Sequence, residues 1–146
     1  MAAATDDRSL MMNAAPSAQR TRVLLVDDNE SMRARADAVL SPTCEVIGTA
    51  ADGPAAIEAA GRLSPDVIVL DISMPGMTGF DVAARLREEG SRAAIVFLTV
   101  YADDTLVVAA REAGVIGYVL KPFLSSDLTV AVEEARAGRH FVSTIA

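Results

Sequence analysis

The stretch VLLVDDNE, residues 23–30, joins four apolar residues directly to two adjacent carboxylates, Asp27 and Asp28. Four apolar residues in succession are typical of a strand that is buried on both faces. Two like charges side by side, where such a strand reaches the surface, repel each other unless one is protonated or a cation lies between them. The stretch therefore predicts a buried strand whose carboxyl end needs a positively charged partner.

Four further apolar runs follow along the chain, and Ala-rich segments with polar residues at helical spacing lie between them. Because the runs are continuously apolar, we expect an α/β three-layer sandwich in which a five-stranded parallel sheet lies between helices. The predicted strands are residues 23–26, 45–49, 67–70, 94–98 and 115–119.

Local signals indicate where the helices begin and end. Residues 52–54, Asp-Gly-Pro, predict a cap with proline in the first turn, and residues 78–81, Thr-Gly-Phe-Asp, resemble a capping box. The pair Asp103 and Asp104 suits the start of the fourth helix. Three glycines follow helix-forming stretches and can supply a left-handed residue that ends a helix: Gly90, Gly114 and Gly138.

The composition fits one globular domain. The chain has 146 residues, of which 51% are hydrophobic, and its formal net charge of -7 opposes binding to nucleic acid or to anionic lipid. The single cysteine, Cys44, excludes an intramolecular disulfide and fits a reducing compartment. No stretch approaches the roughly 20 apolar residues of a membrane span. We therefore expect a cytoplasmic protein that binds neither nucleic acid nor membrane directly.

Residues 1–20 show no period, and they predict a flexible leader rather than a secretory signal. The domain itself is expected over residues 21–138, followed by a C-terminal tail over residues 139–146. The sequence contains no internal repeat or low-complexity block.

Side chains that can do chemistry follow four of the five predicted strands. Asp27 and Asp28 follow the first strand, Asp71 the third, Thr99 the fourth and Lys121 the fifth. In an open parallel sheet the carboxyl ends of the strands meet at one edge, and ligands bind there. The sequence therefore predicts that these five side chains converge.

Three carboxylates, a hydroxyl and an ammonium suit a hard divalent cation such as Mg²⁺ together with a phosphoryl group. Adjacent strand residues point in opposite directions, so we expect Asp28 nearer the metal and Asp27 linked to it through water. With the cation offsetting the charge, Asp71 can attack a phosphoryl group and become an acyl phosphate. Lys121 and the Thr99 hydroxyl would bind the other phosphoryl oxygens.

The segments LLVDDN, VLDISMPGMTG, FLT and GYVLKPF, in this order, resemble the receiver domain of bacterial two-component response regulators. The resemblance implies a flavodoxin-like fold with strand order 2-1-3-4-5. It implies that a histidine kinase or a phosphotransfer protein phosphorylates Asp71 from a phosphohistidine. It also implies Mg²⁺, which Mn²⁺ can replace, held by Asp28, Asp71, the Ser73 backbone carbonyl and, through water, Asp27. Such a protein promotes its own phosphorylation and dephosphorylation and is not a turnover enzyme.

The same resemblance implies a cis bond between Lys121 and Pro122, and a switch. On phosphorylation Thr99 moves toward the phosphoryl group and Tyr118 turns inward. The face made by the fourth helix, fifth strand and fifth helix then changes its partners, and it can pair with a second copy of the chain.

Two residues near the site depart from the family's pattern. Val100 stands where a small residue is usual, and it would narrow the phosphoryl entrance. Tyr101 and Ser73 occupy positions that tune the lifetime of the acyl phosphate, and the bulk of Tyr101 predicts slow autodephosphorylation. Gly76 and Gly79 match the family's turn after the nucleophile, where positive φ or close approach suits glycine.

Two interpretations of the output stay open. The last helix and the tail RHFVSTIA resemble receivers that continue into a helix-turn-helix DNA-binding domain. The chain is either a stand-alone receiver that acts through protein contacts, which we prefer, or the receiver half of a transcriptional regulator whose output domain lies outside this sequence.

Three other functions fit the sequence less well. A flavin-binding flavodoxin would have a Ser/Thr/Gly-rich loop after the first strand, where this chain is acidic. An aspartyl-phosphate hydrolase would have its nucleophile on the first strand with a second acid two residues later, and DDNE lacks that spacing. A receiver that binds partners without phosphorylation would not need all of the side chains that this sequence retains.

Overall fold

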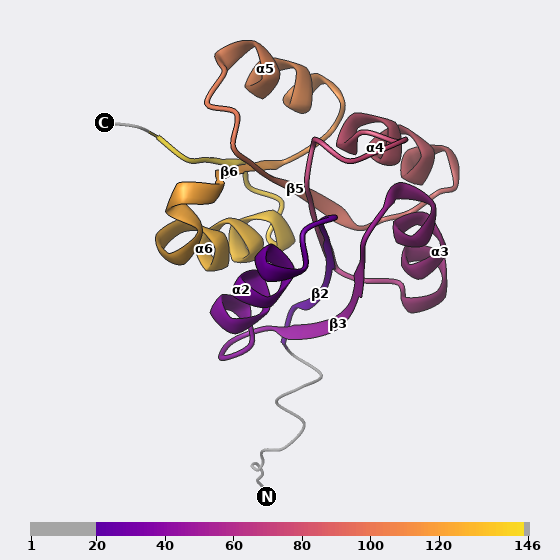
Figure 1. Cartoon of the computed structure of the whole chain (residues 1–146), viewed down its shortest axis with the longest axis horizontal. Coiled ribbons are helices and arrows are strands. Elements are labelled where there is room, and N and C mark those ends of the chain that lie inside the picture. Colours follow the sequence, from indigo (N-terminus) through magenta and orange to yellow (C-terminus); the bar gives the residue numbers. More distant parts are fainter. Residues whose placement is uncertain (1–19, 145–146) are drawn as a thin grey trace, which may run out of the picture.

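Figure 1 shows the computed structural model of the chain, which describes residues 20–144. The leader predicted over residues 1–20 lies outside the described residues, except for Arg20. The elements are β2 (Arg22–Val26), α2 (Glu30–Leu40), β3 (Glu45–Ala50), α3 (Gly53–Leu63), β4 (Val67–Leu70), α4 (Gly79–Glu88), β5 (Ala94–Thr99), α5 (Asp104–Glu112), β6 (Gly117–Leu120), the 3₁₀ turn η1 (Lys121–Phe123), α6 (Leu124–Arg136) and β7 (Phe141–Val142).

All strand pairs are parallel, in the order β3-β2-β4-β5-β6-β7. Numbered along the chain, β2 to β6 are the first to fifth strands, and they lie in the predicted order 2-1-3-4-5. The prediction of an α/β flavodoxin-like fold is therefore confirmed. The sheet differs from the prediction by one strand, because residues of the predicted tail form β7 beside β6.

Two apolar cores lie on the two faces of the sheet. Val23 and Leu25 of β2 pack into the core under α2 and α6, whereas Leu24 and Val26 pack into the core under α3, α4 and α5 (Figure 1). Successive strand residues point to opposite faces, so every position of a central strand must be apolar. Full burial of a Val or Leu side chain contributes about 1.5–3 kcal/mol, which explains the continuous apolar runs.

The predicted helix signals act as expected. Asp52 caps α3 by accepting from the Ala55 N–H, with proline in the first turn, and Thr78 and Asp81 form the capping box of α4. Asp103, rather than Asp104, caps α5. All three predicted helix-ending glycines have positive φ, at Gly90, Gly114 and Gly138.

The fifth predicted strand was placed two residues too early. Residues 115 and 116 lie between α5 and β6, and the Val115 N–H donates to the Ala110 carbonyl of α5 after the left-handed Gly114. An apolar residue at this point commonly packs back on its helix, and Val115 is buried for that reason. An apolar side chain at a helix end therefore had the sequence signature of a strand.

The prediction of a cis Lys121–Pro122 bond is wrong, because the described residues contain no cis peptide bond. The trans form remains the favoured one before proline, although only by about 0.5–1 kcal/mol. Here Lys121 and Pro122 open η1, and the Leu124 N–H donates to the Lys121 carbonyl.

Candidate functional site

The carboxyl ends of β2, β4 and β6 bring four of the predicted side chains together. Carboxylate oxygens of Asp27, Asp28 and Asp71 all lie within 4.8 Å of one another. The Lys121 Nζ lies 3.0 Å from Oδ2 of Asp27 and 3.3 Å from Oδ2 of Asp71. We call these four residues the carboxyl-end cluster. The sequence prediction that their side chains converge is therefore met for these four residues.

The carboxyl-end cluster carries more negative than positive charge in a buried place. Asp71 is 5% exposed, and burial, followed by the charge of Asp27, raises the pKa of its carboxyl above the usual range although Lys121 opposes the rise. Burial lowers the pKa of Lys121, but the contacts with Asp27 and Asp71 outweigh it and leave this pKa raised. The ammonium is thus kept charged, and it offsets only part of the carboxylate charge.

The turn after β2 is fixed by two residues that the sequence reading did not single out. The Asn29 N–H donates to Oδ1 of Asp27 at 2.8 Å, while the Asn29 side chain caps α2. The Arg33 guanidinium donates to the backbone carbonyl of Asp27 at 2.7 Å. Asp27 is buried and Asp28 is exposed, so the two adjacent acids differ in their access to water. The asparagine after the acids was a readable capping signal, whereas Arg33 had none.

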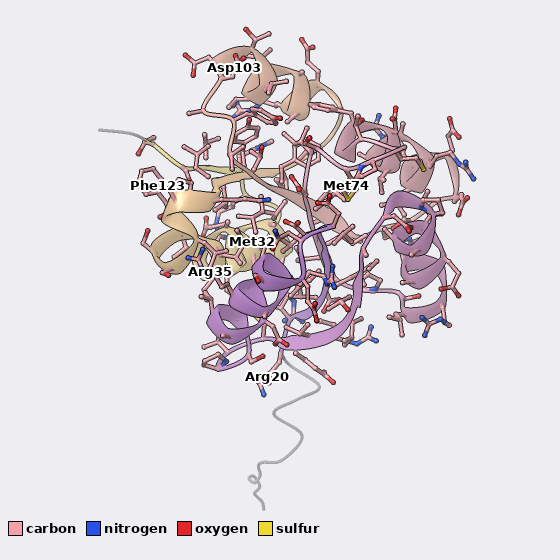
Figure 2. All side chains as sticks on the ribbon, in the orientation of Figure 1. Arg20, Met32, Arg35, Met74, Asp103 and Phe123 are labelled. Atoms are coloured by element: carbon pink, nitrogen blue, oxygen red, sulfur yellow. The ribbon has the colours of Figure 1, made fainter. Side chains whose placement is uncertain are left out.

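The turn after β4 holds Asp71 against the start of α4. The Ser73 N–H donates to Oδ1 of Asp71 at 3.2 Å. A Cβ atom added to Gly79 would lie 2.6 Å from the Asp71 carbonyl oxygen, so only glycine permits this approach. Gly76 has a φ of +84°, as its predicted place in the turn requires. Figure 2 labels Met74 in the same turn.

Thr99 and Tyr118 are joined through the backbone of Tyr101. Thr99 is fully buried, and its Oγ1 accepts from the Tyr101 N–H at 3.2 Å. The Tyr118 hydroxyl donates to the Tyr101 carbonyl at 2.6 Å, and its ring packs edge-to-face against Phe97. Tyr118 is thus already turned inward in this structure. Among the described residues, no hydrogen bond or ion pair joins Thr99 to the carboxyl-end cluster.

The donor set of the carboxyl-end cluster fits a hard divalent cation. Three carboxylates meet there, and the buried Oδ2 of Asp27 has the Lys121 ammonium nearby but no aligned hydrogen-bond donor. Mg²⁺ prefers one or two carboxylates and retains waters, which the exposed position of Asp28 allows.

None of the helices within residues 20–144 has the length and apolar character that a membrane span requires.

The family model described as "Response regulator receiver domain" matches residues 23–133. The nitrate/nitrite response regulator protein NarP of Escherichia coli is 43% identical over 125 residues, which cover 84% of this chain and 57% of that protein. The transcriptional regulatory protein LiaR of Bacillus subtilis is 40% identical over 119 residues, covering 80% of this chain and 56% of that protein. The chain therefore spans little more than half the length of these relatives.

Solved structures agree with the fold. The signal receiver domain of the putative response regulator NarL from Mycobacterium tuberculosis superposes with a TM-score of 0.78 at 32% identity, and the match covers 82% of this chain and 98% of that one. A two-component response regulator of the LuxR family from Aurantimonas gives a TM-score of 0.79 at 30% identity, covering 84% and 89%.

Proposed function

The chain belongs to the response regulator receiver domain family, and from this membership we propose that Asp71 is the residue that accepts the phosphoryl group. The donor is the phosphohistidine of a histidine kinase or a phosphotransfer protein. The observation that carries the proposal is the position of Asp71, which lies 3.3 Å from the Lys121 ammonium and within reach of two further carboxylates.

In the proposed transfer, an Oδ atom of Asp71 attacks phosphorus and forms an O–P bond. The P–N bond of the donor breaks, and the imidazole nitrogen keeps the electron pair. Lys121 and the Thr99 hydroxyl bind phosphoryl oxygens, which removes part of the repulsion between two anions. A dianionic group could not approach these carboxylates without such partners.

Asp28, Asp71 and the Ser73 backbone carbonyl would hold Mg²⁺, with Asp27 linked through water, and Mn²⁺ can take the same place. When bound, the cation supplies charge that offsets both the carboxylates and the incoming phosphoryl group. The protein's own contribution is to hold the carboxylates in place through Asn29, Arg33 and the close approach at Gly79.

The proposed switch uses the shared contact at Tyr101. When the Thr99 hydroxyl turns to a phosphoryl oxygen, the Tyr101 N–H loses its acceptor, and the same residue holds the Tyr118 hydroxyl. A cavity of about 290 Å³ adjoins Tyr118 and offers its ring a second position. A change at the site would therefore shift the face formed by α5, β6 and α6 between two conformations.

The output of this domain is also a proposal. The signal passes from the face formed by α5, β6 and α6 to a downstream protein or a second copy of the chain, in the cytoplasm where the kinase acts. The alternative is a DNA-binding output region outside this sequence. The relative LiaR is described as a transcriptional regulatory protein, which supports this alternative. Slow autodephosphorylation caused by the half-exposed Tyr101 ring stays a prediction, and Tyr101→Ala should shorten the lifetime of the phosphorylated form.

The test is intact mass after incubation with acetyl phosphate and Mg²⁺. We expect wild-type protein to gain one phosphoryl group and Asp71→Asn to gain none. Asp66→Asn, which alters an acid at the opposite end of β4, is the matched control and should gain the group. A phosphoryl group on the Asp71→Asn variant, or none on wild type, contradicts the proposal.

A further inference from the structure

β7 lies along the edge of β6, between α5 and α6, as Figure 1 shows. It is only two residues long, and it pairs Phe141 with Gly117 and Val142 with Tyr118. So short a strand makes few backbone hydrogen bonds, so other contacts must hold this segment against β6.

Ser143, directly after β7, provides such contacts. Its backbone N–H donates to the Tyr118 carbonyl at 2.8 Å, and its hydroxyl oxygen accepts from the Leu120 N–H at 3.1 Å. The hydroxyl thus takes the place of the carbonyl that a longer β7 would offer to β6. The hydroxyl donates its own proton to Oδ2 of Asp127 at 2.6 Å, which directs the oxygen lone pairs toward Leu120.

The hydrogen bond to Leu120 lies next to the carboxyl-end cluster. Leu120 is the last residue of β6, and the following residue is Lys121, whose ammonium contacts Asp27 and Asp71. Ser143 is 8% exposed and Leu120 5%, so water cannot readily replace the hydroxyl as an acceptor. The end of β6 is therefore held on this side by a single serine side chain.

We propose that Ser143 is a positioning residue for phosphoryl transfer, which holds the end of β6 so that Lys121 keeps its place beside Asp71. Asp127 orients the Ser143 hydroxyl. The inference rests on the proposed function of Asp71. The carboxylates of the site follow β2 and β4 instead, so Mg²⁺ binding does not depend on Ser143.

The first test compares rates of phosphorylation by acetyl phosphate and Mg²⁺, followed by intact mass. Ser143→Ala should slow the gain of the phosphoryl group roughly 3- to 10-fold, the scale of one lost hydrogen bond, without changing the dissociation constant of Mg²⁺. Ser143→Thr keeps the hydroxyl and should restore the rate. Thr144→Ala, at the exposed neighbouring position, is the control and should leave the rate unchanged.

A double-mutant cycle tests whether Ser143 acts through Lys121. Ser143→Ala combined with Lys121→Ala should be no slower than Lys121→Ala alone, whereas additive losses contradict the inference. Hydrogen exchange gives a readout without any phosphodonor, since the Leu120 amide should exchange faster in Ser143→Ala.

The outcomes separate the two proposals. A wild-type protein that gains no phosphoryl group overturns the function of Asp71 and this inference with it. Equal rates in wild type and Ser143→Ala, or a fall in Mg²⁺ affinity that accounts for the slower rate, overturn this inference alone. If Ser143→Ala does not fold, Asp127→Ala keeps Ser143 and removes the acceptor of its hydroxyl, together with an exposed contact to Ser126, and an unchanged rate in that variant contradicts the inference.

Discussion

Two polar clusters lie at opposite ends of the same sheet, and they differ in how their charges are balanced. The amino-end cluster consists of Thr21, Cys44, Glu133 and Arg136. The Thr21 hydroxyl lies 3.3 Å from both Glu133 carboxylate oxygens and accepts from Arg136 at 3.1 Å. At the carboxyl-end cluster, three carboxylates share one ammonium.

This difference in charge balance distinguishes polar residues that stabilise the fold from polar residues that bind a ligand. Buried polar groups in a structural role are hydrogen-bonded, as the Thr21 hydroxyl is, and the exposed Glu133 carboxylate has a guanidinium in the same group of residues. The carboxyl-end cluster has an excess of negative charge that no described side chain neutralises, which is the state expected of a site that receives a cation. Arg20, which Figure 2 labels, lies beside the amino-end cluster and donates to the Cys44 carbonyl at 3.0 Å.

The largest expected effect comes from removing the ammonium. Lys121→Ala leaves Asp27 and Asp71 buried without their cation, and it should lower the free energy of unfolding by about 3–5 kcal/mol at neutral pH. Urea unfolding in the presence of a chelator measures this loss. Arg62→Ala removes an exposed ion pair with Glu58 and should cost less than about 1 kcal/mol. Equal losses in the two variants would mean that the ammonium does not balance the cluster.

Mg²⁺ should stabilise the folded protein through the carboxyl-end cluster and not through the amino-end cluster. At 100 times its dissociation constant, a ligand that binds only the folded state adds about 2.7 kcal/mol. We expect this gain in wild type and in Glu133→Gln, and most of it should disappear in Asp28→Asn. Thermal unfolding with and without Mg²⁺ measures the difference, and a full gain in Asp28→Asn would rule out the proposed ligand set.

The amino-end cluster should respond to the loss of one hydroxyl. Thr21→Val removes a partner of both Glu133 and Arg136, which are exposed and can bind water instead, so it should lower the free energy of unfolding by about 0.5–1.5 kcal/mol. The Mg²⁺ affinity should not change. Denaturant unfolding and Mg²⁺ titration together check both statements, and a Thr21→Val variant that is more stable than wild type would contradict the structural role of this cluster.

The smallest expected effect is an increase in the free energy of unfolding, and it comes from Asp71→Asn. Because burial and the charge of Asp27 raise the pKa of Asp71, the folded state binds this proton more tightly than the unfolded state. Stability from this group is present at low pH and is lost as the pH rises through the folded pKa. Asp71→Asn cannot ionise, so in chelator at neutral pH it should be more stable than wild type. Unfolding curves across the acid range test this, and a less stable variant at neutral pH would contradict it.

Much of the architecture could be read from local signals. The apolar runs gave four strands nearly to the residue, since a buried parallel strand must be apolar at every position. The caps at Asp52 and Thr78 were readable because their chemistry is local. The convergence of Asp27, Asp28, Asp71 and Lys121 followed from parallel topology, because their strand ends share one edge.

What the sequence could not predict depends on contacts between distant segments. β7 has two residues and no period, and its place is set by Ser143 and by packing on β6. The Arg33 contact with the Asp27 carbonyl has no local signature. The cis Lys121–Pro122 bond was predicted from a resemblance alone, and the structure has a trans bond at the start of η1. The roles assigned to individual site residues remain proposals for the experiments above.

The link from Tyr118 to Tyr101 has a practical consequence. The chain contains no tryptophan and only these two tyrosines, and the hydroxyl of Tyr118 in β6 donates to the carbonyl of Tyr101 in the loop that follows Thr99. Ultraviolet emission from the native protein therefore originates at the switch and almost nowhere else. Rearrangement of that loop should be visible as a change in tyrosine fluorescence, without any label or engineered probe.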